Sequence, residues 1–167
     1  MKYTDLIFDL YGTLVDIRTE ENRTVWKKTA LYFGYYGIPY TAQALKADFE
    51  AALAMRQAQA GQSYECFPDI PIEEIFSQLA GKKCPDTFGV QAAQLFRICS
   101  TKYIRLYPGV PEALQALRGQ GCRIWLLSNA QRVFTAFELE HLRLQDVFDG
   151  IYISSDYGCR KPDQRFF

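Results

Sequence analysis

Three short segments of this chain carry polar side chains that could act together in one reaction. Asp9 directly follows the apolar run Leu6–Phe8 and precedes a turn at Gly12, with the Thr13 hydroxyl next along the chain. In open α/β sheets, ligands bind at the carboxyl ends of the strands, and a carboxylate there can attack an electrophile to form a covalent intermediate. A strand-ending aspartate that only caps a turn would also account for this segment.

The other two segments also place polar groups after predicted strands. Ser128 and Asn129 follow the apolar run Arg123–Leu127, where their donors suit an anionic group or, alternatively, cap the next helix. Lys161 lies in a loop after the predicted strand Ile151–Ser155, because the proline that follows it disfavours helix. Taken alone, this lysine would be a solvated surface residue. Together the segments predict a nucleophile, anion donors and a cation at one edge of a sheet.

Alternating strands and helices must bring these residues together. The second half of the chain predicts a helix, a strand, a helix and a strand over residues 110–119, 122–127, 132–144 and 150–154. Strands alternating with helices of this length indicate βαβ units and a parallel sheet, so the fold class is α/β. We expect the strand holding Leu6–Phe8 to lie beside the one holding Ile124–Leu127.

Residues 16–105 lack the strand patterning of the flanks and predict only helices. The expected helices cover residues 20–34, 42–60, a segment starting at Pro71, and 88–103. The aromatic cluster Tyr32–Tyr36 would suit a substrate pocket, but we favour core packing. Arg56 would suit a substrate carboxylate, but we favour a solvated helix face.

Composition excludes several classes of protein. The 167 residues are 49% hydrophobic and 15% aromatic, which is typical of a packed domain. A net charge of zero without a basic stripe argues against nucleic acid as the main partner. The apolar runs are too short for a membrane helix, and no signal-peptide pattern is present. The partner we expect is a small-molecule substrate, and the oligomeric state stays open.

Cysteine and histidine usage narrows the chemistry. The five cysteines form no C-x-x-C pair, so we expect reduced thiols in a cytoplasmic protein rather than disulfides or structural zinc. The single histidine, His141, excludes a histidine-rich metal centre. Its surroundings show no G-x-S-x-G nucleophile turn of the kind that serine hydrolases use.

The three segments resemble, in order, the first three motifs of the haloacid dehalogenase-like (HAD) hydrolase superfamily, in its helical-cap subfamily. The matching residues are Asp9–Leu14 (DLYGTL), Leu127–Asn129 (LSN) and Gly158–Asp163 (GCRKPD). The resemblance implies a Rossmann-like parallel-sheet core over residues 1–15 and 106–167, with an inserted all-helical cap over 16–105. The family's fourth motif, an acidic segment after a further strand, has no counterpart before Phe167, so we expect a C-terminally incomplete core.

The resemblance also implies roles for the motif residues. Asp9 would be the nucleophile, and Lys161 would keep it ionised. Thr13 would place a hydroxyl near the nucleophile or a bound anion. Ser128 and Asn129 would bind the transferring group of the substrate.

Tyr11 stands where family phosphatases usually carry an aspartate that acts as general acid and base. Tyrosine at this place is what the 2-haloacid dehalogenase branch shows, and it could donate a proton only with a much lowered pKa. For a phosphate substrate, Mg²⁺ would bind the Asp9 carboxylate and the backbone carbonyl of Tyr11. A dehalogenase would need no metal.

We therefore expect a HAD-like hydrolase with an aspartate nucleophile, and place a small-molecule phosphate monoester first among its substrates. A 2-haloacid dehalogenase is the alternative, since a halide departs without a proton. Against it, the helical block lacks an arginine among aromatic residues just after its first helix. A catalytically idle member that serves as a binding or regulatory module is the third possibility.

Overall fold

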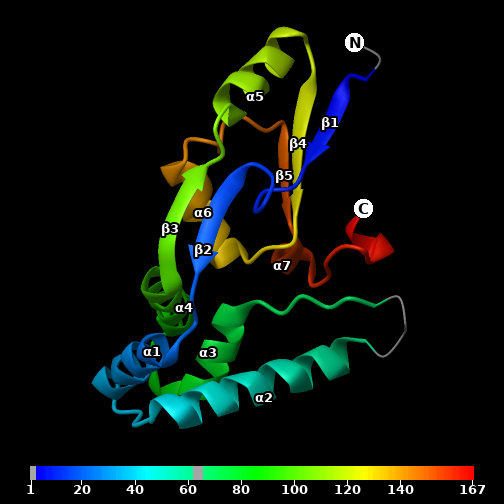
Figure 1. Ribbon diagram of the computed structural model, residues 1–167. Coiled ribbons are helices and arrows are strands. Elements are labelled where there is room, and N and C mark those ends of the chain that lie inside the picture. The colour runs from blue at the N-terminus through cyan, green and yellow to red at the C-terminus, as the bar shows by residue number, and fades with distance from the viewer. Residues whose placement is uncertain (1–2, 62–65) are drawn as a thin grey trace.

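A three-stranded parallel sheet supports the segments that carry the predicted site (Figure 1). The computed structural model describes residues 3–61 and 66–167. Strand β1 (Asp5–Phe8) pairs with β4 (Arg123–Ser128), which pairs with β5 (Gly150–Ile153). Leu6 lies opposite Ile124, so the predicted neighbourhood of these two strands is confirmed. Residues at the carboxyl ends of β1 and β4 therefore meet at one edge.

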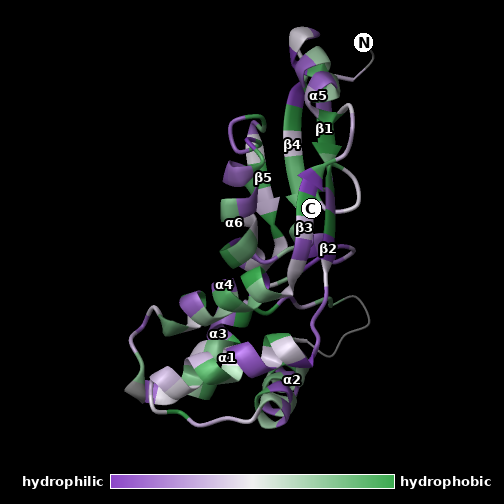
Figure 2. Ribbon diagram, turned by 60° about the vertical axis from the view of Figure 1, so that its left-hand side comes forward, coloured by the Kyte–Doolittle hydropathy of each residue, from purple (hydrophilic) through white to green (hydrophobic). Residues whose placement is uncertain are grey.

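Helices α5 (Val110–Gly119) and α6 (Arg132–His141) lead into β4 and β5. Helix α5 begins after Gly109, whose φ of 82° is a left-handed conformation that glycine adopts without strain. One face of the sheet packs on these helices in a buried cluster, while Ile7 on the other face is 67% exposed. Figure 2 shows the hydrophobic colouring that runs along β1 and parts of β4. After β5 the chain forms the short helix α7 (Ser154–Tyr157) and the 3₁₀ turn η2 (Gln164–Phe166).

Four helices between β2 and β3 form what we call the helical insertion. They are α1 (Arg23–Tyr35), α2 (Ala42–Ala60), α3 (Ile72–Ala80) and α4 (Phe88–Ser100), with the 3₁₀ turn η1 (Gly81–Lys83) between the last two. The Thr41 side chain accepts a hydrogen bond from the Ala44 N–H, which fixes the start of α2. The insertion has an apolar core of its own, separate from that of the sheet. Phe33 is fully buried in it, 4.8 Å from the Phe88 ring, as predicted for the aromatic cluster, although Tyr35 is exposed.

A two-stranded antiparallel ribbon joins the insertion to the sheet. It consists of β2 (Val15–Thr19) and β3 (Thr101–Leu106). The prediction of only helices over residues 16–105 is wrong at both ends, where β2 and β3 lie, and α4 ends at Ser100 rather than Tyr103. The Ser100 and Thr101 hydroxyls both donate to the Arg97 carbonyl, and the chain then pairs with β2, a partner more than eighty residues away. Within the described residues, no helix is long and apolar enough to cross a membrane.

Candidate active site

Asp9 and Lys161 form an ion pair at the carboxyl edge of the sheet. Lys161 Nζ lies 3.2 Å from Asp9 Oδ1, and the two side chains are 26% and 42% exposed. Nζ also donates to the Leu127 carbonyl at 2.8 Å, near the end of β4. Chain segments at positions 9, 127 and 161 therefore converge, and the carboxylate stays partly open to solvent and to a substrate.

Asn129 holds the backbone of Lys161. Its Oδ1 accepts from the Lys161 N–H at 2.8 Å, and its Nδ2 donates to the Lys161 carbonyl at 3.2 Å. These bonds place the lysine loop beside β4, a role that sequence reasoning missed. An amide nitrogen carries two protons, and only one of them is used in a hydrogen bond within the described residues, so the other N–H could donate to a bound group.

The same loop is also fastened on its far side. Asp163 is buried and accepts from the backbone N–H of Phe67, at 3.1 Å, on the segment between α2 and α3. Hydrogen bonds from Arg165 hold the pKa of the Asp163 carboxyl well below its usual range. Lys161 is thus held between the helical insertion and the end of β4.

Ser128 and Thr13 differ in their surroundings. The Ser128 hydroxyl is buried at the end of β4 and has no hydrogen-bond partner among the described residues. Buried polar groups normally have a partner, so this oxygen is a candidate contact for a bound group. Thr13 is exposed, in a turn where the N–H groups of Thr13, Leu14 and Val15 all donate to the Leu10 carbonyl.

Tyr11 points its hydroxyl toward helix α6. The hydroxyl donates to Glu138 and lies 3.2 Å from the Thr135 hydroxyl. Burial, followed by the nearby Glu138 charge, raises the pKa of Tyr11. A general acid at this position would need a lowered pKa, so these contacts argue against Tyr11 in that role. Glu138 was not predicted as a site residue. The one indication in the sequence is that this charged residue lies next to Leu139, on the apolar face of a predicted helix.

Oxygen donors for a metal ion are present but few. One Asp9 oxygen remains beside the one paired with Lys161, and no backbone N–H of the described residues donates to the Tyr11 carbonyl. Mg²⁺ is commonly held by one or two carboxylates together with water and substrate phosphate, so these two oxygens fit it in kind. The described residues contain no cluster of three side chains that could hold a metal ion by themselves.

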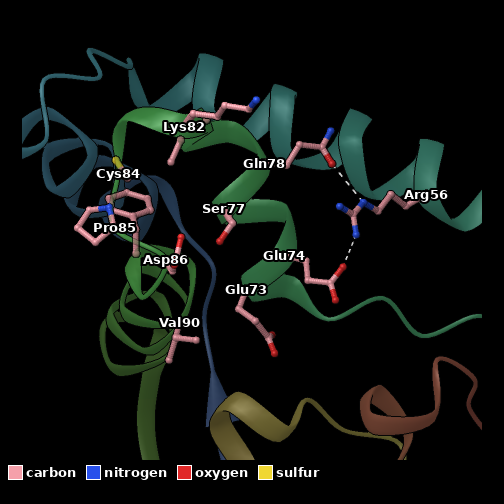
Figure 3. Close-up of a pocket in the computed structure, with 13 residues that line it drawn as sticks. Arg56, Glu73, Glu74, Ser77, Gln78, Lys82, Cys84, Pro85, Asp86 and Val90 are labelled. Atoms are coloured by element: carbon pink, nitrogen blue, oxygen red, sulfur yellow. Dashed lines mark hydrogen bonds and ion pairs between the residues drawn. The ribbon is translucent and has the colours of Figure 1, made fainter.

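The helical insertion contains a separate polar hollow of about 720 Å³ (Figure 3). Residues of α3, of the α3–α4 connection and of the first turn of α4 line it, together with Arg56 of α2. Arg56 donates to Glu74 and, at 3.1 Å, to Gln78, so it is paired on this surface. None of the residues predicted for the active site lines the hollow.

Comparisons with known proteins agree with these motifs. The family model of haloacid dehalogenase-like hydrolases matches residues 6–167. Among solved structures, the HAD-hydrolase YfnB from Bacillus subtilis, described as bound to magnesium, is 20% identical with a TM-score of 0.48, and the match covers 100% of this chain and 72% of that one.

Two further structures have different named activities. A protein from Haemophilus somnus, named as a predicted phosphoglycolate phosphatase, is 18% identical with a TM-score of 0.45, over 97% of this chain and 67% of that one. The L-2-haloacid dehalogenase from Xanthobacter autotrophicus, with chloropropionic acid covalently bound, is 16% identical with a TM-score of 0.46, over 98% and 61%. Because the family model covers nearly the whole sequence, the chain belongs to the haloacid dehalogenase-like hydrolases.

Proposed function

We propose that this hydrolase uses Asp9 as its nucleophile and that its substrate is a small-molecule phosphate monoester. The observation that supports the proposal best is the ion pair between Asp9 and Lys161, 3.2 Å apart at the carboxyl edge of the sheet. Beside it, the end of β4 presents the buried Ser128 hydroxyl, which has no partner in the part of the chain that the structure describes. A carboxylate, a cation and a free donor are what transfer of an anionic group requires.

Each residue has a defined part in this mechanism. The Asp9 carboxylate attacks phosphorus, the ester oxygen departs, and water then cleaves the acyl phosphate. Lys161, 3.2 Å from Asp9, balances the negative charge that gathers at the nucleophile and the phosphoryl group. Ser128 and the remaining N–H of Asn129 donate to the phosphoryl oxygens, and Thr13 supplies a further hydroxyl at the turn.

Mg²⁺, bound by the free Asp9 oxygen and the Tyr11 carbonyl, would neutralise charge between the phosphate and the nucleophile. Two residues after Asp9 the chain carries Tyr11 instead of a carboxylic acid. The Tyr11 hydroxyl is bonded to Glu138, so it does not serve as the general acid for the leaving group. We therefore propose phosphate esters whose leaving group departs without a proton, such as aryl phosphates. We also propose that the protein acts on this small molecule in the cytoplasm.

A 2-haloacid is the second candidate substrate, and the Tyr11 geometry is the observation that favours it. A halide needs no proton when it leaves, so a Tyr11 hydroxyl that is bonded to Glu138 and is a weak acid would not hinder this reaction. Here Asp9 would attack carbon and form an ester that water resolves.

Steady-state assays on three compounds separate these functions: an aryl phosphate, an alkyl phosphate and 2-chloropropionate, each with Mg²⁺ and with a chelator. We expect turnover of the aryl phosphate with Mg²⁺, its loss with the chelator, and slower turnover of the alkyl phosphate. Turnover of 2-chloropropionate in the chelator, with none on either phosphate, would reject the phosphatase proposal in favour of the haloacid.

A further inference from the structure

Helix α6 and its N-cap residue carry a polar stripe that contacts both the nucleophile turn and the helical insertion. Thr135 and Glu138 are three residues apart and share one face of the helix, and the N-cap residue Gln131 precedes Thr135 by four residues. Thr135 is fully buried and Glu138 is only 5% exposed. Polar groups are costly to bury without partners, so the contacts of this stripe define a specific arrangement.

Glu138 joins the nucleophile turn to the insertion. Its carboxylate accepts from the Tyr11 hydroxyl, two residues after Asp9. The same carboxylate accepts two hydrogen bonds from Arg97 in the last turn of α4, at 2.6 and 3.1 Å. The Arg97 guanidinium also lies 4.9 Å from the Phe134 ring and 5.6 Å from the Tyr11 ring. A buried negative charge is thus shared between the sheet side and α4.

Gln131 makes a second connection at the other end of the stripe. Its Oε1 accepts from the Ile72 N–H at the start of α3, at 3.0 Å, and its Nε2 donates to Asp69 at 2.8 Å. The Thr135 hydroxyl donates to the Gln131 carbonyl at 3.0 Å and also contacts Tyr11. The insertion is therefore held to α6 at the beginning of α3 and at the end of α4.

We propose that Glu138 is a positioning residue, which fixes the turn that carries Asp9 by holding Tyr11 against Arg97. This inference rests on the proposed role of Asp9 as nucleophile. When α4 moves away from α6, the Arg97–Glu138 bonds break and the carboxylate is left buried with Tyr11 alone. The position of the nucleophile is then coupled to the position of the insertion. A misplacement of about 1 Å at a reacting group can lower the rate about 100-fold.

Glu138→Gln tests the proposal with little change of shape. Glu138 accepts three hydrogen bonds through its two oxygens, one from Tyr11 and two from Arg97. A glutamine replaces one of these oxygens with an NH₂ donor and removes the negative charge, so it cannot keep all three bonds. We expect kcat on the aryl phosphate to fall by about 10- to 100-fold while KM changes by less than about threefold. Asp16→Asn is the matched control: it makes the same change from carboxylate to amide and removes the charge that pairs with Arg105 across the ribbon, and we expect it to leave kcat unchanged.

Tyr11→Phe separates positioning from a general loss of structure, because it keeps the ring and removes only the hydroxyl. If the turn is held through the Tyr11–Glu138 bond, Tyr11→Phe lowers kcat, and the double variant with Glu138→Gln is no slower than the slower single variant. A silent Tyr11→Phe, or losses that multiply in the double variant, would overturn the proposal.

Amide hydrogen exchange gives a readout that does not depend on any substrate. We expect Glu138→Gln and Tyr11→Phe to speed exchange in residues 10–15 and 97–101 together, while Asp16→Asn leaves residues 10–15 unchanged. Faster exchange in residues 97–101 alone would overturn the positioning role. If no test substrate is turned over by the wild type, the proposed function fails, and the exchange result still decides whether Glu138 couples the two segments.

Discussion

Replacing Tyr11 with aspartate tests whether this position is an impaired catalytic site or a structural contact. Family phosphatases usually carry an acid/base aspartate here, and such a group contributes about 10²–10⁴-fold to the rate. From the sequence alone, Tyr11→Asp would therefore raise the turnover of a phosphate ester by up to that factor. In the structure, however, the Tyr11 hydroxyl is a partner of the buried Glu138 carboxylate.

The contacts of Tyr11 set the size of the expected loss. A hydrogen bond to a charged group contributes about 1.5–3 kcal/mol, and the Arg97 contact with the ring about 0.5–1 kcal/mol. Tyr11→Asp removes both, about 2–4 kcal/mol, and adds a second carboxylate near Glu138. For a chain of 167 residues, each kcal/mol lowers Tm by about 2–4 °C, so we expect a decrease of about 4–16 °C.

Thermal unfolding and steady-state hydrolysis of an aryl phosphate measure the two effects on the same preparation. We expect Tyr11→Asp to melt lower and to turn over more slowly than the wild type. The control Tyr11→Phe keeps the ring and loses only the hydroxyl bond, about 1.5–3 kcal/mol. A Tyr11→Asp variant that melts within about 2 °C of the wild type and hydrolyses faster would refute the structural role of Tyr11.

Two further predictions concern Lys161 and Asp69. Lys161→Met removes the cation 3.2 Å from Asp9, and we expect kcat to fall about 10²- to 10³-fold. The control Lys102→Met removes a lysine from an exposed ion pair, and its kcat should stay within about twofold of the wild type; equal effects of the two changes would contradict the role of Lys161. Burial raises the pKa of Asp69, so as pH falls from about 7 the folded state takes up a proton at this group before the unfolded state does, and the contribution of Asp69 to the free energy of unfolding rises through the folded pKa. Asp69→Asn removes this contribution, so in urea unfolding we expect the free energy of unfolding of the wild type to gain on that of the variant as pH falls; a difference between the two proteins that does not change with pH would reject this assignment.

Several elements could be predicted because local signals determine them. Helix α2 spans Ala42–Ala60 as expected, since Thr41 caps its start and Gly61 follows its end. The buried runs of β1 and β4 predicted a parallel pair, and the structure has Leu6 opposite Ile124. Strand β3 was missed because Thr101–Leu106 continues a helical pattern locally, and its strand conformation depends on pairing with β2.

The site shows the same division between local and distant information. Strand ends predicted that Asp9 and Lys161 would meet, and their side chains are 3.2 Å apart. The engagement of Asn129 with the Lys161 backbone was not foreseen, because an amide after a strand has many possible partners. Neither was the bond from Tyr11 to Glu138, 127 residues away, which depends on how α6 packs on the sheet.

The most direct test of Asp9 as nucleophile is peptide mass spectrometry after rapid quenching of a single turnover with an aryl phosphate and Mg²⁺. We predict a phosphoryl group on Asp9 in the wild type, and neither adduct nor turnover in Asp9→Asn that melts like the wild type. Retained hydrolysis by a folded Asp9→Asn variant, or a phosphoryl group on another residue, would contradict the account.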